Sequence, residues 1–306
     1  MSGTLAIVGA GGVLGAKLVE HALAATDARI HAFTHGATPA IPAAQSDRVT
    51  WQPLDLADSA TIVDTLSAVH PSIVINAAAM TNVDACEARR EEALAANAAG
   101  PRHLASACVQ LGARLLHVST DYVFPGDDQQ PGPYVEDAPV RPVNYYGWTK
   151  LQGEQAIAEV CDGHVPWLVV RTALVYGYVP GGRTNFITWL AGELRAGRRV
   201  KVVHDQFNTP TLADDLATAL LHLAQRDSQG IIHVAGPDLI SRDAWARAIA
   251  AYYALDESLI DVLSTAELKQ PAQRPLRSGL RTSRAAERTG VTLRGITAGL
   301  EALGAH

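Results

Sequence analysis

Short apolar runs alternate along the chain with longer stretches in which apolar residues recur at helical spacing. The apolar runs predict strands at Leu5–Ala10, Arg29–Thr34, Ser72–Asn76, Ala113–Val118 and Pro166–Arg171. The stretches between them predict helices at Val13–Ala25, Ser59–Val69, Val83–Leu111 and Asn144–Val160. Because strands separated by helices join through right-handed crossovers, this rhythm predicts an α/β protein with a doubly wound parallel sheet.

After about residue 172 the pattern loosens into turns rich in glycine and proline. This region predicts a helix near Thr184–Ala196, short strands near Val200–Val203 and Ile231–Val234, and helices at the end of the chain. The change of pattern divides the chain into a first domain, 1–171, and a smaller α/β lobe, 172–306. We expect this lobe to face the substrate and to return some of its chain to the first domain.

Composition narrows the possible partners. The chain has 306 residues, 48% of them hydrophobic, and a formal net charge of -6 without a long run of one sign. That balance gives no electrostatic footprint for nucleic acid or an anionic membrane. No window holds the roughly twenty apolar residues that a membrane span needs. The cysteines, Cys86, Cys108 and Cys161, are far apart, which favours reduced thiols and a cytoplasmic protein.

A glycine-rich turn follows the first predicted strand and opens the first predicted helix. Glycine there permits a tight turn and lets the backbone approach a pyrophosphate, whose charge the free amides of a helix N-terminus stabilise. A turn without a ligand is the alternative, but the strand before it and the helix after it favour dinucleotide binding. The first domain is therefore predicted to be a Rossmann-type domain, with cofactor contacts at Gly9, Gly11, Gly12, Val13, Leu14 and Gly15.

The end of the second strand bears on the choice of cofactor. Thr34 and His35 stand there with no acidic residue to bind a ribose 2'-hydroxyl, and both could donate to a 2'-phosphate. The sequence therefore favours NADPH and leaves NADH open. Asp55 and Leu56 follow a further short strand, the third in chain order, which precedes the helix predicted at Ser59–Val69. There they could meet the adenine. Small residues after the fourth strand would let the dinucleotide pass close to the backbone, and they are Ala77, Ala78 and Ala79.

Three side chains predict a reacting centre at the carboxyl edge of the sheet. Tyr146 and Lys150 lie four residues apart, so they share one face of a predicted helix. An ammonium beside a phenol lowers the pKa of the phenol and makes it a better proton donor near neutral pH. Thr120 ends the fifth strand, where its hydroxyl can hold a carbonyl oxygen. This set predicts reduction of a ketone by hydride from a nicotinamide.

At this point the chain resembles the extended short-chain dehydrogenase/reductases, and among them the dTDP-4-dehydrorhamnose reductase group. The resemblance runs across nearly the whole chain, and its most specific parts are Ser119–Phe124 and Tyr146–Glu154. It implies reduction of a 4-keto group on a nucleotide-activated deoxysugar by Thr120, Tyr146 and Lys150, with Lys150 also contacting the nicotinamide ribose.

The resemblance also implies a set of substrate contacts, many of them in the second lobe. They are Thr81, Val83, Thr120, Tyr122, Phe124, Asn185, Phe186, Gln206, Pro210, Thr211 and Arg274. Homologues of this kind are monomers or homodimers.

Several positions depart from the pattern of the group. Met80 stands where a tyrosine is often found, and Leu174 stands where an aromatic residue often lines the sugar pocket. Lys17 replaces an acidic residue that helps some relatives bind magnesium, so no metal is expected. The histidines, His117 and His233 among them, are scattered, which favours structural imidazoles over metal ligands.

Two rival functions remain open from the sequence. One is a nucleotide-sugar epimerase or dehydratase of the same superfamily, although dehydratases usually follow the catalytic threonine with Asp-Glu and here Asp121 and Tyr122 follow Thr120. The other is a non-catalytic, NADP-binding regulatory subunit that resembles the β subunit of methionine adenosyltransferase.

Overall fold

A seven-stranded parallel sheet forms the centre of the computed structural model, which describes residues 3–36 and 38–304. The strand order is β11-β6-β5-β4-β1-β2-β3, and every neighbouring pair is parallel. The doubly wound α/β fold predicted from the sequence is thereby confirmed. The strands of this sheet are β1 (Thr4–Val8), β2 (Arg29–Thr34), β3 (Val49–Pro53), β4 (Ile73–Asn76), β5 (Arg114–Thr120), β6 (Trp167–Thr172) and β11 (Gly230–His233).

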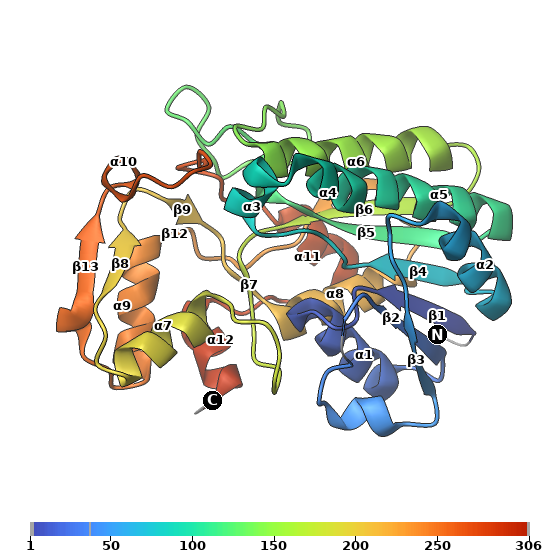
Figure 1. Ribbon diagram of the computed structural model, residues 1–306, viewed down its shortest axis with the longest axis horizontal. Helices are drawn as coiled ribbons and strands as arrows, with labels where there is room; N and C mark the ends of the chain where they lie inside the picture. Colours follow the sequence, from blue (N-terminus) through green and yellow to red (C-terminus); the bar gives the residue numbers. More distant parts are fainter. Residues whose placement is uncertain (1–2, 37, 305–306) are drawn as a thin grey trace.

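Helices cover both faces of the sheet (Figure 1). Successive side chains of a strand point to opposite faces, and β1 shows the consequence: Leu5 and Ile7 belong to one core cluster, and Ala6 and Val8 to another. The first cluster is closed by α1 (Val13–Ala25), α8 (Ala213–Ala224) and α11 (Ser283–Thr289). The second cluster is closed by α2 (Ser59–Val69), α5 (Gly100–Leu111) and α6 (Tyr145–Cys161).

Local signals explain why the first two helices have their predicted bounds. The helix α1 begins directly after the glycine turn, and α2 begins at Asp58, whose carboxylate accepts a hydrogen bond from the Thr61 amide at 3.2 Å. The helix α2 ends at His70, which adopts the left-handed conformation with φ 44°.

The single helix predicted over Val83–Leu111 is wrong. The structure has α3 (Val83–Ala88), α4 (Arg90–Leu94), a π-helical turn η2 (Ala95–Ala99) and then α5. Arg89 leaves the helical conformation with φ -122° and ψ 63°. Pro101 has no amide hydrogen to bond four residues back, so the wider π turn precedes it. The break buries Asn97 and lets its carbonyl oxygen approach Gly153 of α6, where a Cβ would lie 2.3 Å away.

The second lobe has its own core cluster beside the sheet. Figure 1 shows β8, β13, α7 and α9 together at the side of the molecule away from the N-terminus. This core joins α7 (Phe186–Arg195), β8 (Val200–Val203), α9 (Arg242–Tyr252), β13 (Ile260–Leu263) and α12 (Ile296–Leu303).

Part of the second lobe returns to the sheet, because β11 pairs with β6 and α8 packs beside α1. The remaining short elements are η1 (Pro42–Gln45), η3 (Asp121–Val123), β7 (Val175–Tyr176), β9 (Phe207–Asn208), β10 (Thr211–Leu212), β12 (Ile240–Ser241), η4 (Glu257–Leu259) and α10 (Thr265–Leu268).

A buried ion pair fixes α6 to the sheet. Glu154 of α6 and Arg171 of β6 have side chains only 3% exposed, and the Arg171 Nη2 donates to Glu154 Oε2 at 2.7 Å. The Arg171 Nε donates to the same carboxylate at 3.0 Å, and Ser119 Oγ donates to it as well. Because α6 carries Tyr146 and Lys150, this ion pair also fixes the position of both residues relative to the strand ends.

Among the described residues, no helix is long and apolar enough to cross a membrane.

Candidate active site

The glycine turn lies between the carboxyl end of β1 and the start of α1. The N-cap of α1 is Gly12, and no side chain caps this helix. Gly9 has φ 84° and lies so close to β4 that a Cβ would come within 2.5 Å of the Ala78 amide nitrogen. The first turn of α1 therefore keeps amides free for an anion, which fits a dinucleotide. Leu14 and Gly15 are buried behind that turn, whereas Gly11, Gly12 and Val13 are partly exposed.

The residues predicted to meet the adenosine half lie together at the ends of β2 and β3. Thr34 is buried, and its hydroxyl forms a local turn by accepting from the Gly36 amide at 3.1 Å. The His35 side chain is 80% exposed, and its Nε2 lies 3.7 Å from Asp55 Oδ2. Leu56 is buried, and its carbonyl oxygen lies 3.2 Å from His103 Nδ1. Of this group, His35 and Asp55 present side chains to solvent.

Thr120 and Tyr146 meet as predicted. The helix α6 begins at Asn144, whose side chain accepts from the Gly147 amide at 2.8 Å. Gly147 is required because a Cβ there would lie 2.2 Å from the Tyr122 carbonyl oxygen, so η3 and α6 come close. Thr120 hydrogen-bonds the Tyr146 hydroxyl. The Tyr122 ring packs edge-on against the Tyr146 ring, with centroids 5.7 Å apart.

The expected lowering of the Tyr146 pKa by Lys150 is wrong in this structure. Burial raises the pKa of Tyr146 above its ordinary value, although its hydrogen bond with Thr120 acts in the opposite direction. The Lys150 Nζ instead lies 3.1 Å from His117 Nε2 and donates to the Val118 carbonyl oxygen at 2.8 Å. Burial also lowers the pKa of Lys150 to about 8, against the charge of Glu154. Helical spacing placed both groups on α6 but did not reveal the partner of Lys150.

Asp121 is a buried carboxylate next to this pair that the sequence did not mark. Its Oδ2 accepts from Ser278 Oγ and, at 3.2 Å, from Asn208 Nδ2, while Thr120 Oγ1 donates to Oδ1 at 3.2 Å. Burial raises its pKa to about 6 despite these hydrogen bonds. A carboxylate this well satisfied still costs free energy when it ionises, because it has left water.

We expect Asp121 to contribute a loss of stability as the pH rises from about 4 to about 7. Its pKa is higher in the folded state than in the unfolded state, so its contribution is complete below the unfolded pKa and disappears as the pH passes about 6. Asp121→Asn should remove about 2–3 kcal/mol of this dependence. Urea unfolding at several pH values measures it. The surface variant Asp127→Asn is the control, and an identical pH dependence in Asp121→Asn would contradict the expectation.

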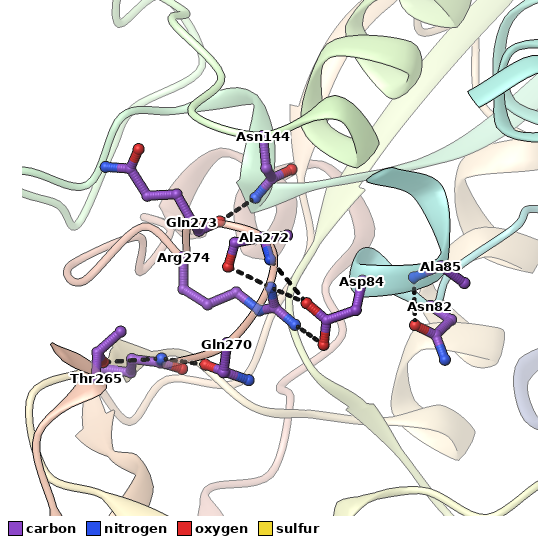
Figure 2. A network of polar contacts seen from close by, with 10 residues as sticks. Asn82, Asp84, Ala85, Asn144, Thr265, Gln270, Ala272, Gln273 and Arg274 are labelled. Carbon is purple, nitrogen blue, oxygen red and sulfur yellow. Dashed lines mark hydrogen bonds and ion pairs between the residues drawn. The ribbon is translucent and has the colours of Figure 1, made fainter. Parts of the chain in front are cut away.

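Arg274 forms a salt bridge with Asp84 of α3 (Figure 2). The guanidinium donates to both carboxylate oxygens of Asp84 at 2.9 Å, and the Ala272 amide donates to the same carboxylate at 3.0 Å. These bonds from Arg274 and Ala272 keep the pKa of Asp84 below its ordinary value, although burial acts to raise it. Asn144 also donates to the Gln273 carbonyl oxygen at 2.7 Å. Arg274 therefore joins the second lobe to α3 and α6 rather than presenting a free cation.

Other predicted substrate contacts also have structural partners. Gln206 is buried and donates to Thr265 Oγ1 at 3.0 Å and to Gln270 Oε1 at 3.2 Å. Asn185 caps α7 and donates to the Gly177 carbonyl oxygen at 2.6 Å.

Phe124 is fully buried and stacks on Tyr134 with ring centroids 4.1 Å apart, so it is a core residue and the prediction of a substrate contact is corrected.

The remaining predicted substrate contacts differ in burial and in their neighbours. Thr81 is exposed, and Val83 packs against the small apolar cluster that includes Tyr122 and Tyr146. Pro210 and Thr211 follow β9, and Thr211 is buried with its hydroxyl bonded to the Ala173 carbonyl oxygen at 2.8 Å.

Two departures from the family pattern also lie here. Met80 exchanges backbone hydrogen bonds with Asn97, and Leu174 adopts a left-handed backbone with φ 43°. A branched residue in that conformation stores strain beside the site.

Arg242 is the residue that the sequence reasoning missed. It opens α9, and its guanidinium stacks over Phe186 at 4.8 Å and over Trp245 at 5.7 Å. Within the described part of the chain, this guanidinium contacts no carboxylate, and burial lowers its pKa. The nearby charges of Asp121 and Tyr122 place it close to the catalytic pair. In the sequence, Ser241 is a helix N-cap residue, which predicts where a helix begins but not what the Arg242 side chain contacts.

No group of side chains suited to a metal occurs among residues 3–36 and 38–304. The Lys17 ammonium forms an ion pair with Glu20 at 3.0 Å and lies 3.6 Å from the Asp214 carboxylate. The thiols of Cys86, Cys108 and Cys161 are buried and free.

The parallel sheet, the uncapped glycine turn and the Thr120–Tyr146 pair define a dinucleotide-binding protein of the short-chain dehydrogenase/reductase class. Residues 3–305 match the family described as the RmlD substrate binding domain. The chain is 39% identical over 281 residues to a dTDP-4-dehydrorhamnose reductase of Mycobacterium tuberculosis, covering 90% of this chain and 84% of that protein. It belongs to this reductase family.

Further relatives agree with this assignment. A dTDP-4-dehydrorhamnose reductase of Sinorhizobium fredii is 34% identical over 251 residues, covering 78% of this chain and 81% of that protein. The crystal structure of the Bacillus anthracis reductase, solved in complex with NADP, superimposes with a TM-score of 0.83 at 28% identity, and 99% of each chain is covered. The resemblance found in the sequence is thereby confirmed.

Proposed function

We propose that this protein reduces the 4-keto group of a nucleotide-activated deoxysugar, with NADPH favoured as the hydride donor. The observation that carries the proposal is the buried Thr120–Tyr146 hydroxyl pair at the carboxyl edge of the same sheet that presents the uncapped glycine turn. The names of the relatives support the same substrate class, and the NADP complex of the Bacillus anthracis enzyme supports the cofactor.

The residues of this chain have separate roles in the proposed reaction. When bound, the cofactor supplies a hydride to the carbonyl carbon. Thr120 donates a hydrogen bond to the ketone oxygen, and Tyr146 donates to the same oxygen and gives it a proton. The apolar cluster of Met80, Val83 and Tyr122 excludes water from the reacting atoms.

We assign cofactor binding to residues 1–171 and most of the sugar nucleotide site to residues 172–306. His35 and Asp55 lie where the adenosine would be held, and His35 provides a donor for a 2'-phosphate. The buried free thiols and the absence of a basic run favour a reducing, cytoplasmic location and a small-molecule partner. We expect a monomer or homodimer.

Arg242 is assigned to the diphosphate of the substrate, because a guanidinium that lies against the stacked rings of Phe186 and Trp245 and has no carboxylate partner among the described residues is free to bind an anion. Arg242→Met should raise the KM for the nucleotide sugar by about 10- to 100-fold, the value of one or two charge-assisted hydrogen bonds. The kcat and the NADPH affinity should change little. Arg247→Met, an exposed change on the same helix, is the control. An unchanged KM would remove Arg242 from the substrate site.

The proposal is tested by titrating NADPH and NADH against the purified protein and then adding nucleotide 4-keto sugars one at a time. Loss of reduced-nicotinamide absorbance that depends on one such sugar would support the reductase and identify its substrate. Tight cofactor binding without turnover on any sugar would refute it and favour the regulatory subunit, and isomerisation without net oxidation would favour an epimerase.

A further inference from the structure

Lys150 ends a chain of buried polar groups that begins at β4. Asn76 of β4 and His117 of β5 are both 0% exposed. The Asn76 Nδ2 lies 3.0 Å from His117 Nδ1, and His117 Nε2 lies 3.1 Å from Lys150 Nζ. At the other end, the Ala78 amide nitrogen lies 3.0 Å from Asn76 Oδ1. Each group has a defined neighbour, so the direction of each hydrogen bond can be worked out along the chain.

The direction is fixed at the backbone. The Ala78 amide can only donate, so the atom of Asn76 that faces it must be the carbonyl oxygen. The amide nitrogen of Asn76 therefore faces His117, and it too can only donate. His117 Nδ1 must then accept this hydrogen bond. Turning the imidazole ring over would remove both of its partners at once.

His117 is consequently a neutral imidazole with its proton on Nε2. Burial in β5 holds the pKa of His117 well below its ordinary value. A neutral ring carries one proton, and because Nδ1 accepts, the proton is on Nε2 and points at Lys150 Nζ. An ammonium has no lone pair to receive it, whereas a neutral amine has one. The same Nζ donates to the Val118 carbonyl oxygen at 2.8 Å.

We propose that Asn76 and His117 are positioning residues that present an N–H donor to Lys150 and hold it on β5 as a neutral amine. Charging Lys150 would place two donors face to face, so Lys150 takes up a proton from solvent only when its Nζ leaves His117. The released ammonium is then free to act on Tyr146 and on a cofactor ribose. This catalytic meaning rests on the proposed function, but the protonation state does not.

The charged groups around Lys150 do not alter this conclusion. Glu154, one turn along α6, favours the ammonium, but its carboxylate is already bound by Arg171 of β6. The ionisable groups of η3 and α3, which are Asp121, Tyr122 and Cys86, act on Tyr146. Burial outweighs Glu154 and lowers the pKa of Lys150 to about 8, so the neutral amine bound to His117 is the main form above that pH and the released ammonium is the main form below it.

The first test is the tautomer of His117 in the wild-type protein. Nitrogen-15 NMR of histidine-labelled protein distinguishes a protonated Nε2 from a protonated Nδ1, and His117→Gln identifies the signal. We expect the Nε2–H form. His233 is an internal control because its Nδ1 faces the Tyr134 carbonyl oxygen at 3.2 Å, which requires the Nδ1–H form. An Nδ1–H form at His117, or an imidazolium, would overturn the proposal without any assay of activity.

The second test reverses the direction of the chain with Asn76→Asp. A carboxylate accepts from both neighbours, so His117 should move its proton to Nδ1 and offer Nε2 as an acceptor for an ammonium. The titration midpoint of Lys150 should rise by one pH unit or more, a tenfold or greater gain in proton affinity. Lysine-15N spectra measure it, with the other lysines, Lys17, Lys201 and Lys269, as references.

Asn97→Asp separates the reversed direction from the added charge. Asn97 is also fully buried, but its amide bonds Met80 and Thr149 rather than His117. We expect it to leave the His117 tautomer unchanged. A Lys150 midpoint that rises equally in both variants, or a His117 proton that stays on Nε2 in Asn76→Asp, would refute the role assigned to the pair. Failure of the reductase assay with the expected tautomers would count against the proposed function alone.

Discussion

Tyr146→Phe is expected to lower kcat by about 10²- to 10⁴-fold, the usual contribution of a positioned general acid. Phenylalanine keeps the ring that packs against Tyr122 but removes the hydroxyl that is hydrogen-bonded to Thr120. Burial raises the pKa of Tyr146, so the phenol is fully protonated at neutral pH and ready to donate to a ketone oxygen. Turnover is measured with the nucleotide 4-keto sugar that the assay identifies.

The neighbouring Tyr145→Phe is the matched control. Tyr145 lies on the same turn of α6 but stacks on Trp148, with ring centroids 5.2 Å apart, and carries the Arg90 guanidinium over its ring at 4.9 Å. It should retain wild-type turnover. Fluorescence titration should give both variants the NADPH affinity of the wild type, because the phenol is needed for the proton and not for holding the dinucleotide. A Tyr146→Phe enzyme within tenfold of wild type would remove Tyr146 from the mechanism.

The sequence predicted best where local signals decide the structure. The bounds of α1 and α2 follow from the glycine turn, from the Asp58 cap and from the left-handed His70, all of which act within a few residues. The glycine turn and the four-residue spacing of Tyr146 and Lys150 are local in the same sense. The structure confirms the fold class and places Tyr146 and Lys150 together on α6.

The sequence predicted least where contacts join distant segments. Arg274 was expected to meet the substrate, and spacing did not reveal its partner Asp84, which lies 190 residues earlier and binds both Nη atoms. Periodicity cannot show such a partner, because it reports which face of an element is apolar and not which element it meets. The break of the long helix before α5 is different, since Pro101 was a visible signal for it.

His117 shows both limits at once. A histidine inside the apolar run of β5 was visible and was interpreted as a structural imidazole, and the structure does bury it. Its role depends on Asn76 of β4 and on Lys150 of α6. The register of β4 with β5 places Asn76 directly opposite His117. A strand's partner is a tertiary property, so the polar chain could not be derived from spacing.

Breaking the buried ion pair should give the largest change in stability. Arg171→Met is expected to lower the free energy of unfolding by about 3–5 kcal/mol, because the carboxylate of Glu154 stays buried without its guanidinium. Urea denaturation at pH 7 measures the change. The exposed pair Arg102–Glu159 also involves α6, and Arg102→Met should leave stability unchanged within error.

The sign of the pH dependence tests the cause of that loss. Without Arg171, burial should raise the pKa of Glu154 in the folded state above its unfolded value, so the variant is stabilised by protonation. Its deficit relative to wild type should therefore be small near pH 4 and grow as the pH rises towards 8. Replacing both partners, in Arg171→Met with Glu154→Leu, should recover most of the loss, because no charge is then left buried. The Arg171 guanidinium also packs over Phe124, 5.1 Å from the centroid of its ring. A double variant as unstable as the single one would show that this packing, and not the neutralisation of the Glu154 charge, holds α6 on the sheet.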